Sequence, residues 1–214
     1  MNTFIENSLR NKPLVDHATL QSLLEQNGYR YINDKIKYMK KKGLLISLKR
    51  GLYIYNSPFE KKLYSKEIVA NNLLGPSYIS FEYALYYHGL IPEMVVEITS
   101  ATIKRSKTFK TEIGIFSYKH IDKKIYPLGI EILSSSQGNF FIASPLKALC
   151  DTIYTSRATM LNSKKRMLAF LIDDLRIDLD ELSDLDLKML KEYAKVSKSK
   201  KIEFLYKVLE DINS

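Results

Sequence analysis

A short segment near the N-terminus combines lysines, a tyrosine and a helical repeat in a way that suits recognition of nucleic acid. Ile32, Ile36 and Met39 recur at intervals of four and three residues, which places them on one face of a helix. The opposite face carries long polar side chains: Asp34, Lys37, Tyr38 and Lys41. Three further lysines flank that face: Lys35, Lys40 and Lys42. Exposed lysines on such a helix can donate hydrogen bonds to guanine O6 and N7 in the major groove of duplex DNA.

The neighbouring segments predict the elements that would hold this basic helix. Residues 16–27 carry leucines at helical spacing, and Gly28 breaks the chain before the basic helix begins. Gly43 ends the basic helix. Residues 44–55 alternate apolar and polar side chains around a turn at residues 49–51, which predicts a β-hairpin. A helix, a turn, a second helix and a hairpin in this order predict a winged helix-turn-helix that binds duplex DNA.

Most polar side chains of the predicted helix-turn-helix and hairpin can be assigned a hypothetical role in DNA binding or in capping a helix. The residues predicted to face the bases are Lys37, Tyr38 and Lys41. The residues predicted to contact phosphate or to form the wing are Arg30, Tyr31, Lys35, Lys42, Lys49 and Arg50. Asn33 is interpreted as the N-cap of the basic helix, because its position and its amide side chain suit capping. On this hypothesis Lys41→Ala weakens base-specific binding, whereas Lys49→Ala weakens binding to all duplexes alike.

The positive charge of the chain is concentrated in the same region. The 214 residues have a net charge of +9. Residues 1–58 contain ten Lys and Arg against four Asp and Glu, a net charge of +6, whereas residues 131–214 are neutral overall. A local positive excess favours contacts with phosphate and the release of counterions from DNA. No lipid-facing amphipathic helix accompanies this charge, so we expect no membrane partner.

The composition is ordinary for a globular protein, with 45% hydrophobic and 27% charged residues. The N-terminus lacks the pattern of a signal peptide, and no apolar run approaches the length of a membrane span. The single cysteine, Cys150, lies in an apolar helical pattern and cannot form an internal disulfide. We therefore expect a cytoplasmic protein in which Cys150 is a core residue.

Residues 56–58 form a turn-rich break after the hairpin, so we predict a winged helix-turn-helix domain over residues 1–57 and a second domain over residues 58–214. Within the second domain, helices are predicted at residues 65–74, 81–88, 161–174, 183–196 and 201–212, and a further helix is predicted to start at Ser144 and Pro145, with Leu146, Leu149 and Ile153 on its inward face. Strands are predicted at residues 78–79, 95–103, 112–118, 129–133 and 140–143. The fold class is therefore α+β: an N-terminal winged helix-turn-helix followed by a mixed α+β domain with C-terminal helices.

The sequence contains no motif for catalysis, metal binding or a cofactor. The three histidines, His17, His88 and His120, are far apart, and none has a second ligand at metal spacing. The aspartates between residues 178 and 186 lack the glycine and glutamate of a calcium loop, and Ser183 with Asp186 resembles the start of a helix. There is no phosphate-binding glycine loop. We therefore expect no enzyme activity and no cofactor.

Three stretches of the chain resemble the AbiEi family of antitoxins, the antitoxin half of type IV toxin–antitoxin pairs. They are Lys42–Tyr53, Tyr78–Pro92 and Ile142–Asp151, and they occur in the order of the family. The middle stretch is the most specific, because it combines an aromatic helix with a glycine and a proline. Leu146 departs from the family, which often has an acidic residue at this position.

The resemblance implies a two-part protein that acts on DNA and on a toxin. The winged helix would repress the antitoxin–toxin operon by binding inverted repeats in its own promoter, which suits either a homodimer on DNA or two monomers bound side by side. The second domain would counteract a nucleotidyltransferase-like toxin without forming a stable complex with it.

Two other classes of function remain open. The first is a stand-alone winged-helix transcription regulator whose second domain senses a small molecule. A cluster of aromatic residues could then line its pocket, although such residues usually fill cores: Phe81, Tyr83, Tyr86 and Tyr87. The second is a nuclease with three carboxylates on or near strands, for which no characteristic spacing is present: Glu97, Glu112 and Asp122.

Overall fold

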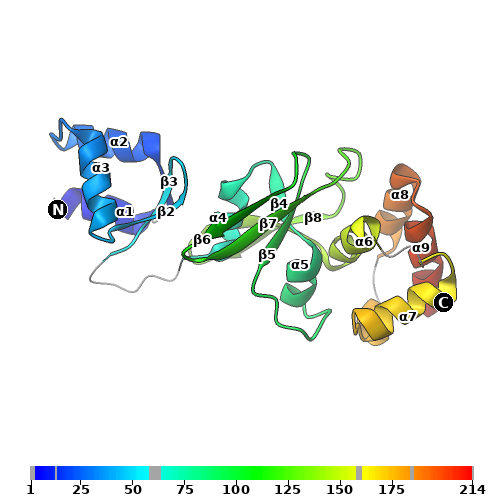
Figure 1. The fold of residues 1–214 in the computed structure, drawn as a ribbon. Helices are drawn as coiled ribbons and strands as arrows, with labels where there is room; N and C mark the ends of the chain where they lie inside the picture. The colour runs from blue at the N-terminus through cyan, green and yellow to red at the C-terminus, as the bar shows by residue number, and fades with distance from the viewer. Residues whose placement is uncertain (1–2, 13, 58–63, 158–160, 184–185, 214) are drawn as a thin grey trace.

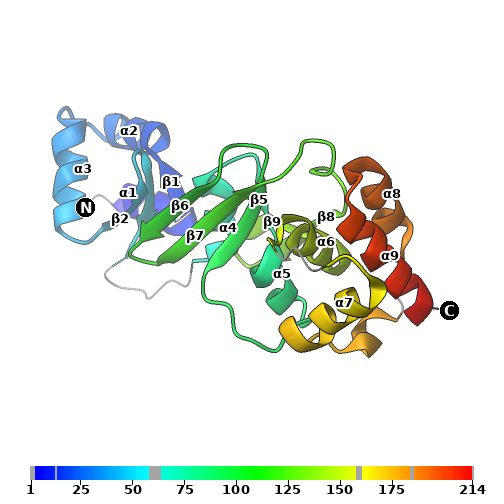
Figure 2. The ribbon, with the colours of Figure 1, turned by 45° about the vertical axis from the view of Figure 1, so that its right-hand side comes forward.

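The computed structural model describes residues 3–12, 14–57, 64–157, 161–183 and 186–213. The protein has a mixed α+β fold with two β-sheets in these ranges. Its N-terminal helices lie at one end of the molecule, the larger sheet lies in the middle, and the C-terminal helices lie at the other end (Figures 1 and 2). No helix among the described residues is long and apolar enough to cross a membrane.

The N-terminal unit consists of three helices and a small antiparallel sheet. Its elements are α1 (Thr3–Asn11), β1 (Leu14–Asp16), α2 (His17–Gln26), α3 (Ile32–Lys41), β2 (Leu45–Lys49) and β3 (Leu52–Tyr55). The strand order is β1-β3-β2. The carboxylate of Asp16 caps α2 by accepting a hydrogen bond of 2.8 Å from the backbone nitrogen of Thr19. The predicted helix over residues 16–27 and the predicted hairpin are therefore confirmed.

Helix α3 buries the face that its sequence predicts. Ile36 and Met39 are buried and Ile32 packs against them, in a cluster that also contains residues of α1, α2 and the small sheet. Gly43 ends the helix with a φ of +70°, and the backbone nitrogen of Leu44 donates to the carbonyl of Met39 at 2.9 Å. A glycine with a positive φ commonly ends a helix in this way, because the backbone N–H groups that follow it can then donate hydrogen bonds to the last carbonyls of the helix.

The larger sheet contains six strands in the order β6-β7-β5-β4-β9-β8. The β7/β5 and β4/β9 pairs are parallel and the other pairs are antiparallel. Its elements are α4 (Lys66–Leu73), β4 (Ser77–Ile79), α5 (Phe81–Tyr87), β5 (Ile98–Thr102), β6 (Lys107–Thr111), β7 (Gly114–His120), β8 (Ile130–Ser135), β9 (Gly138–Ala143) and α6 (Pro145–Thr155). Strand β6 was not predicted, because it is an edge strand with the sequence KTFKT and has no apolar alternation.

The C-terminal segment is helical, as predicted, but it is more interrupted than its sequence suggests. Its elements are α7 (Lys164–Ala169), a π-helical turn (Phe170–Asp174), a 3₁₀ helix (Leu179–Leu182), α8 (Lys188–Ser197) and α9 (Lys200–Ile212). The prediction that Ser183 begins a helix was wrong, because Ser183 ends the 3₁₀ helix and its hydroxyl donates to the carbonyl of Asp180. Asp184, one of the aspartates considered for a calcium loop, lies outside the described residues.

The small sheet of the N-terminal unit contributes side chains to two hydrophobic clusters, one within that unit and one around the larger sheet. In β3, the side chains of Tyr53 and Tyr55 belong to the N-terminal cluster, whereas Leu52 and Ile54 belong to the large cluster around the six-stranded sheet. This alternation follows from the two-residue period of a strand, since the small sheet is covered on both faces. A domain division near residue 57 stays a prediction, and Pro58 of the predicted break lies outside the described residues.

A buried ion pair joins the larger sheet to the C-terminal helices. The Nζ of Lys147 and the Oδ1 of Asp151 are 3.0 Å apart on α6, and both side chains are 0% exposed. The Lys147 ammonium also donates to the carbonyl of Ile125 at 2.7 Å. Three hydroxyl groups donate to the carboxylate oxygens of Asp151: those of Tyr78, Ser80 and Tyr193, at 2.8, 2.8 and 2.9 Å. Because Tyr78, Asp151 and Tyr193 come from β4, α6 and α8, the network holds three elements together.

We expect this protein to lose stability in alkaline solution. Burial raises the pKa of Tyr78, Tyr118 and Tyr193 above the ordinary value of 10.0, and for Tyr78 and Tyr193 the nearby Asp151 carboxylate adds to the effect. Below pH 10 these tyrosines are protonated in both states, whereas above it they release protons only in the unfolded chain. The free energy of unfolding should then fall by about 1.4 kcal/mol per pH unit for each tyrosine.

Urea denaturation at pH 9.0, 10.5 and 11.5 measures this loss. Burial lowers the pKa of Lys147, which acts in the opposite direction but only below the ordinary lysine value of 10.5. The loss between pH 10.5 and 11.5 therefore reports on the buried tyrosines together with Cys150, because burial also raises the pKa of that thiol above its ordinary value. Tyr118→Phe removes one phenol, whose hydroxyl donates to the carbonyl of Ala70, and should make the pH dependence shallower. An unchanged urea midpoint over this range would contradict the prediction.

Candidate nucleic-acid interface

Helix α3 presents its basic face to solvent. Its three side chains predicted to face the bases, Lys37, Tyr38 and Lys41, are all exposed, with Tyr38 50% exposed. They lie within four residues of one another, so they share one side of the helix, opposite the buried Ile36 and Met39. Figures 1 and 2 show α3 on the outside of the N-terminal unit, at the end of the molecule distant from the larger sheet. This face is free to approach a partner.

Contacts between lysines and tyrosine rings organise the same surface. The ammonium of Lys35 lies 4.5 Å from the ring centre of Tyr29 and 5.3 Å from that of Tyr38. The ammonium of Lys42 lies 5.9 Å from the ring centre of Tyr38. Cation–π contacts of this kind keep lysine side chains near a ring without consuming their hydrogen-bond donors. The predicted phosphate-contacting residues Lys35 and Lys42 therefore flank Tyr38 on α3.

The turn between α2 and α3 adds two exposed side chains. Arg30 is exposed and Tyr31 is 79% exposed, which is unusual for a tyrosine and leaves its hydroxyl and ring accessible. The prediction that Asn33 caps α3 was wrong. The N-cap is Tyr31, whose side chain makes no capping hydrogen bond, since Ile32 is already helical and packs against the core. Asn33 is then the second helical residue and lies past the capping position.

The tip of the β2–β3 hairpin differs from the prediction. Lys49 was expected to project as part of a wing, but its ammonium donates to the carbonyls of Asn72 and Leu73 at 3.1 and 2.7 Å. These carbonyls lie at the C-terminal end of α4, where a cation is favourable because the helix leaves carbonyls unpaired there. Lys49 therefore binds within the protein, and of the two predicted wing residues only Arg50 is exposed.

Lys49 is partly buried near two other lysines, unlike the exposed lysines of α3. Partial burial, together with the nearby charges of Lys107 and Lys104, lowers the pKa of Lys49. Lys104 in turn donates to the carbonyl of Gly75, close to the same helix end. The hairpin tip thus meets a cluster of lysines, two of which bind backbone carbonyls, on the side of the N-terminal unit that contacts the larger sheet.

The residues considered for other chemistry lie apart from one another in the described ranges. His88 lies at the end of α5 and its Nε2 lies 2.8 Å from the carbonyl oxygen of Ala143, as a packing role predicts. Cys150 is buried, and burial raises its pKa. In the described part of the chain no three His, Cys, Asp or Glu side chains gather where they could hold a metal ion. The carboxylates considered for a nuclease are all exposed: Glu97, Glu112 and Asp122.

The aromatic residues of α5 mostly pack rather than line a pocket. Phe81 is fully buried, and the hydroxyl of Tyr83 donates to the Glu67 carboxylate. Tyr87 packs edge-on against Phe140, with ring centres 6.0 Å apart, and Tyr86 is partly exposed.

The buried pair of Lys147 and Asp151 was not predicted from the sequence. A lysine and an aspartate four residues apart in an otherwise apolar helix could have indicated an internal ion pair. The hydroxyl partners of Asp151 come from distant segments and leave no local signal.

Comparison with known proteins identifies a shared fold. No family model and no curated protein sequence matches the chain. Among solved structures, the chain is similar to the RV2827C protein from Mycobacterium tuberculosis, with a TM-score of 0.55 and 13% sequence identity. The similarity covers 99% of this chain and 80% of that one. At this level of identity the comparison shows that the two chains share a mixed α+β fold, and it assigns no function.

Proposed function

We propose that this protein is a cytoplasmic DNA-binding regulator whose N-terminal unit is a winged helix-turn-helix. The observation that carries the proposal is the exposed face of α3, where Lys37, Tyr38 and Lys41 stand together above a buried apolar face. A helix of this kind fits the major groove, which admits one helix and offers acceptors on guanine to lysine. Arg30 and Arg50, which are exposed at the α2–α3 turn and the hairpin tip, are candidates for phosphate contacts.

The distribution of charge supports the same proposal. The N-terminal 58 residues have a net charge of +6, and five of their ten cationic residues lie between positions 35 and 42. Neutralisation of phosphates by such a surface supplies sequence-independent affinity, and the donors on α3 supply discrimination between bases.

We further propose that the protein is the antitoxin of a type IV toxin–antitoxin pair and represses its own operon. The support is the resemblance of residues 42–53, 78–92 and 142–151 to the AbiEi family. On this proposal two copies bind inverted repeats in the promoter, and the remainder of the chain opposes a nucleotidyltransferase-like toxin without a stable complex. The protein itself would then not be an enzyme.

A salt titration on the protein's own upstream promoter tests the DNA-binding proposal. Fluorescence anisotropy would compare a labelled promoter duplex with a random duplex of equal length over a series of NaCl concentrations. We expect the affinity for both duplexes to fall steeply with salt, because counterions are released, while the promoter remains at least about a thousandfold preferred. Equal affinity for the two duplexes at every salt concentration would refute sequence-specific binding.

The antitoxin proposal needs a separate experiment. A gene adjacent to that of this protein and encoding a nucleotidyltransferase-like protein would be expressed alone and together with it. Growth arrest is expected when the adjacent gene is expressed alone, and rescue is expected when both genes are expressed. If the adjacent product is not toxic, or if rescue fails, the antitoxin proposal is wrong, although the DNA-binding proposal could still hold.

A further inference from the structure

The second residue of α3, Asn33, is exposed and has no bonding partner within the described part of the chain. An asparagine amide offers one acceptor oxygen and two donor hydrogens, so it can bind a neighbouring donor and acceptor at the same time. Because the N-cap of α3 is Tyr31, the Asn33 amide is not used to begin the helix. It is therefore available to a group outside the protein.

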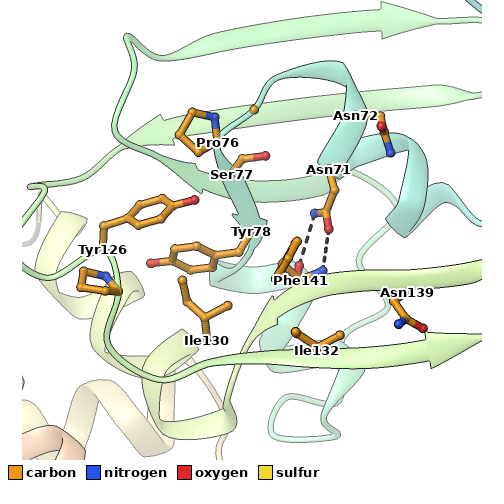
Figure 3. Close-up of a pocket in the computed structure, with 12 residues that line it drawn as sticks. Asn71, Asn72, Pro76, Ser77, Tyr78, Tyr126, Ile130, Ile132, Asn139 and Phe141 are labelled. Atoms are coloured by element: carbon orange, nitrogen blue, oxygen red, sulfur yellow. Dashed lines mark hydrogen bonds between the residues drawn. The ribbon is translucent and has the colours of Figure 1, made fainter. Parts of the chain in front are cut away.

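Another asparagine shows what this side chain does where a donor and an acceptor lie side by side. The Asn71 amide donates to the carbonyl of Phe141 at 3.3 Å and accepts from its backbone nitrogen at 2.5 Å, where α4 meets β9 (Figure 3). Most other asparagine amides in the described ranges also bond within the protein: Asn27, Asn56, Asn72, Asn139, Asn162 and Asn213. Asn33 offers the same two-way bond on the outside of the molecule.

Asn33 stands in line with the two lysines predicted to face the bases. Residues 33, 37 and 41 are four apart, so their side chains form one row along α3, and all three are exposed. The other lysines of this segment lie against tyrosine rings: Lys35, Lys40 and Lys42. Neither Lys37 nor Lys41 makes a ring contact or an ion pair with a described residue. The row of Asn33, Lys37 and Lys41 is thus free to bind a partner.

The first turn of α3 suits base edges better than phosphates. Asp34, next to Asn33, is exposed and makes no ion pair with a described residue. Its carboxylate repels a phosphate at short range, so the DNA backbone is an unfavourable partner for this turn. In the major groove, the same carboxylate can accept from the amino group of cytosine. Helix-turn-helix proteins place the N-terminal residues of the recognition helix against base edges, and Asn33 lies at that end.

The chemistry of this row selects particular bases. In the major groove, adenine presents an acceptor, N7, beside a donor, the N6 amino group, whereas guanine presents two acceptors, N7 and O6. Asparagine matches adenine, because it donates and accepts together, and lysine matches guanine, because it only donates. Residues four apart on a helix are separated by about 6 Å and successive base pairs by about 3.4 Å, so neighbouring members of the row meet bases about two pairs apart.

We propose that Asn33 is a specificity-determining residue that recognises adenine in the operator, about two base pairs from a guanine bound by Lys37. The inference rests on the proposed DNA-binding function of α3 and adds the base that each side chain recognises. The Asn33 amide accepts from the N6 amino group and donates to N7. Adenine is the base whose major-groove edge uses both halves of that amide.

A base-pair scan of the promoter half-site tests this assignment. Competition anisotropy would compare the wild type, Asn33→Ala and Lys37→Ala on duplexes in which each base pair is exchanged in turn. We expect the exchange of one A·T pair to weaken binding of the wild type roughly five- to a hundredfold and to leave Asn33→Ala unaffected. Lys37→Ala should keep this A·T preference and lose sensitivity at a G·C pair about two positions away.

A modified base and a second variant isolate the contact. At that adenine, 7-deaza-2′-deoxyadenosine removes N7 and keeps the Watson–Crick pair. It should weaken binding of the wild type about three- to tenfold, the usual effect of one hydrogen bond, and should not weaken Asn33→Ala further. Asn33→Lys replaces a donor and an acceptor by donors alone, so it should change the preferred base from adenine to guanine. Equal effects of the modified base on wild type and Asn33→Ala would overturn the assignment.

Asn7→Ala is the matched control. Asn7 is also exposed and without a bonding partner among the described residues, but it lies on α1. This variant should keep every base-pair preference. Neither Asn7 nor Asn33 belongs to the buried cluster of the N-terminal unit, and alanine favours a helix, so neither variant should lower the melting temperature. A loss of preference in Asn7→Ala equal to that in Asn33→Ala would contradict recognition by α3.

Two outcomes separate this inference from the proposed function. If the wild type prefers the promoter and Asn33→Ala keeps the same preference at every A·T pair, the assignment of Asn33 is wrong while the DNA-binding function stands. If the wild type binds the promoter and the random duplex equally, both are wrong.

Discussion

Asp151→Ala is expected to destabilise the protein by about 3–5 kcal/mol, a large part of the total stability of an ordinary domain. The substitution would leave the ammonium of Lys147 buried, with the carbonyl of Ile125 as its remaining hydrogen-bond partner among the described residues. It would also remove the acceptor of three buried hydroxyl groups, those of Tyr78, Ser80 and Tyr193. Both losses act in a site without solvent, where an uncompensated charge or donor is most costly. Urea denaturation followed by circular dichroism measures the effect.

An exposed pair of the same two residue types provides the control. Lys164 and Asp211 are 2.7 Å apart, but their side chains are 48% and 61% exposed. Asp211→Ala should cost no more than about 1 kcal/mol, because solvent screens such pairs. Replacing both Lys147 and Asp151 by leucine should cost less than Asp151→Ala alone, since no unpaired charge remains. A similar cost for Asp151→Ala and Asp211→Ala would show that the buried network contributes little.

Removal of Lys37 and Lys41 is expected to abolish the preference for the promoter over random DNA. Each lysine stands on the exposed face of α3, and a good base contact supplies about 1–3 kcal/mol of discrimination. Each single alanine variant should therefore lose roughly five- to a hundredfold in promoter affinity, with a smaller loss on random duplex. The folded state should be unaffected, since neither side chain contributes to the buried cluster. Anisotropy titrations on both duplexes at fixed salt measure the change.

Two other lysines separate base recognition from general charge. Lys195 lies on α8 at the opposite end of the molecule, so Lys195→Ala removes one charge without changing α3. It should retain the promoter preference. Lys49→Ala should mainly lower stability, because its ammonium bonds to the end of α4. Equal losses on promoter and random DNA for Lys37→Ala and Lys41→Ala would rule out their role in reading bases.

The local elements could largely be predicted because their signals lie within a few residues of each other. The spacing of Ile32, Ile36 and Met39 identified the buried face of α3. Ser144 followed by Pro145 identified the start of α6, where the Ser144 hydroxyl accepts from the backbone nitrogen of Lys147. Edge strand β6 escaped prediction, because its mostly exposed side chains need no apolar alternation.

The amino-acid sequence by itself determined that α3 ends before Gly43, which face of that helix is apolar, and which polar side chains remain for a partner. Periodicity and capping depend on neighbours one turn away, so they are visible in a single segment. Only the tertiary structure decided that Lys49 binds the end of α4 and that Asn33 lies past the capping position of α3. Tyr78 meets Asp151 across 73 positions of the chain. A residue's type limits the bonds that it can make, but the packing of distant segments determines which partner is within reach.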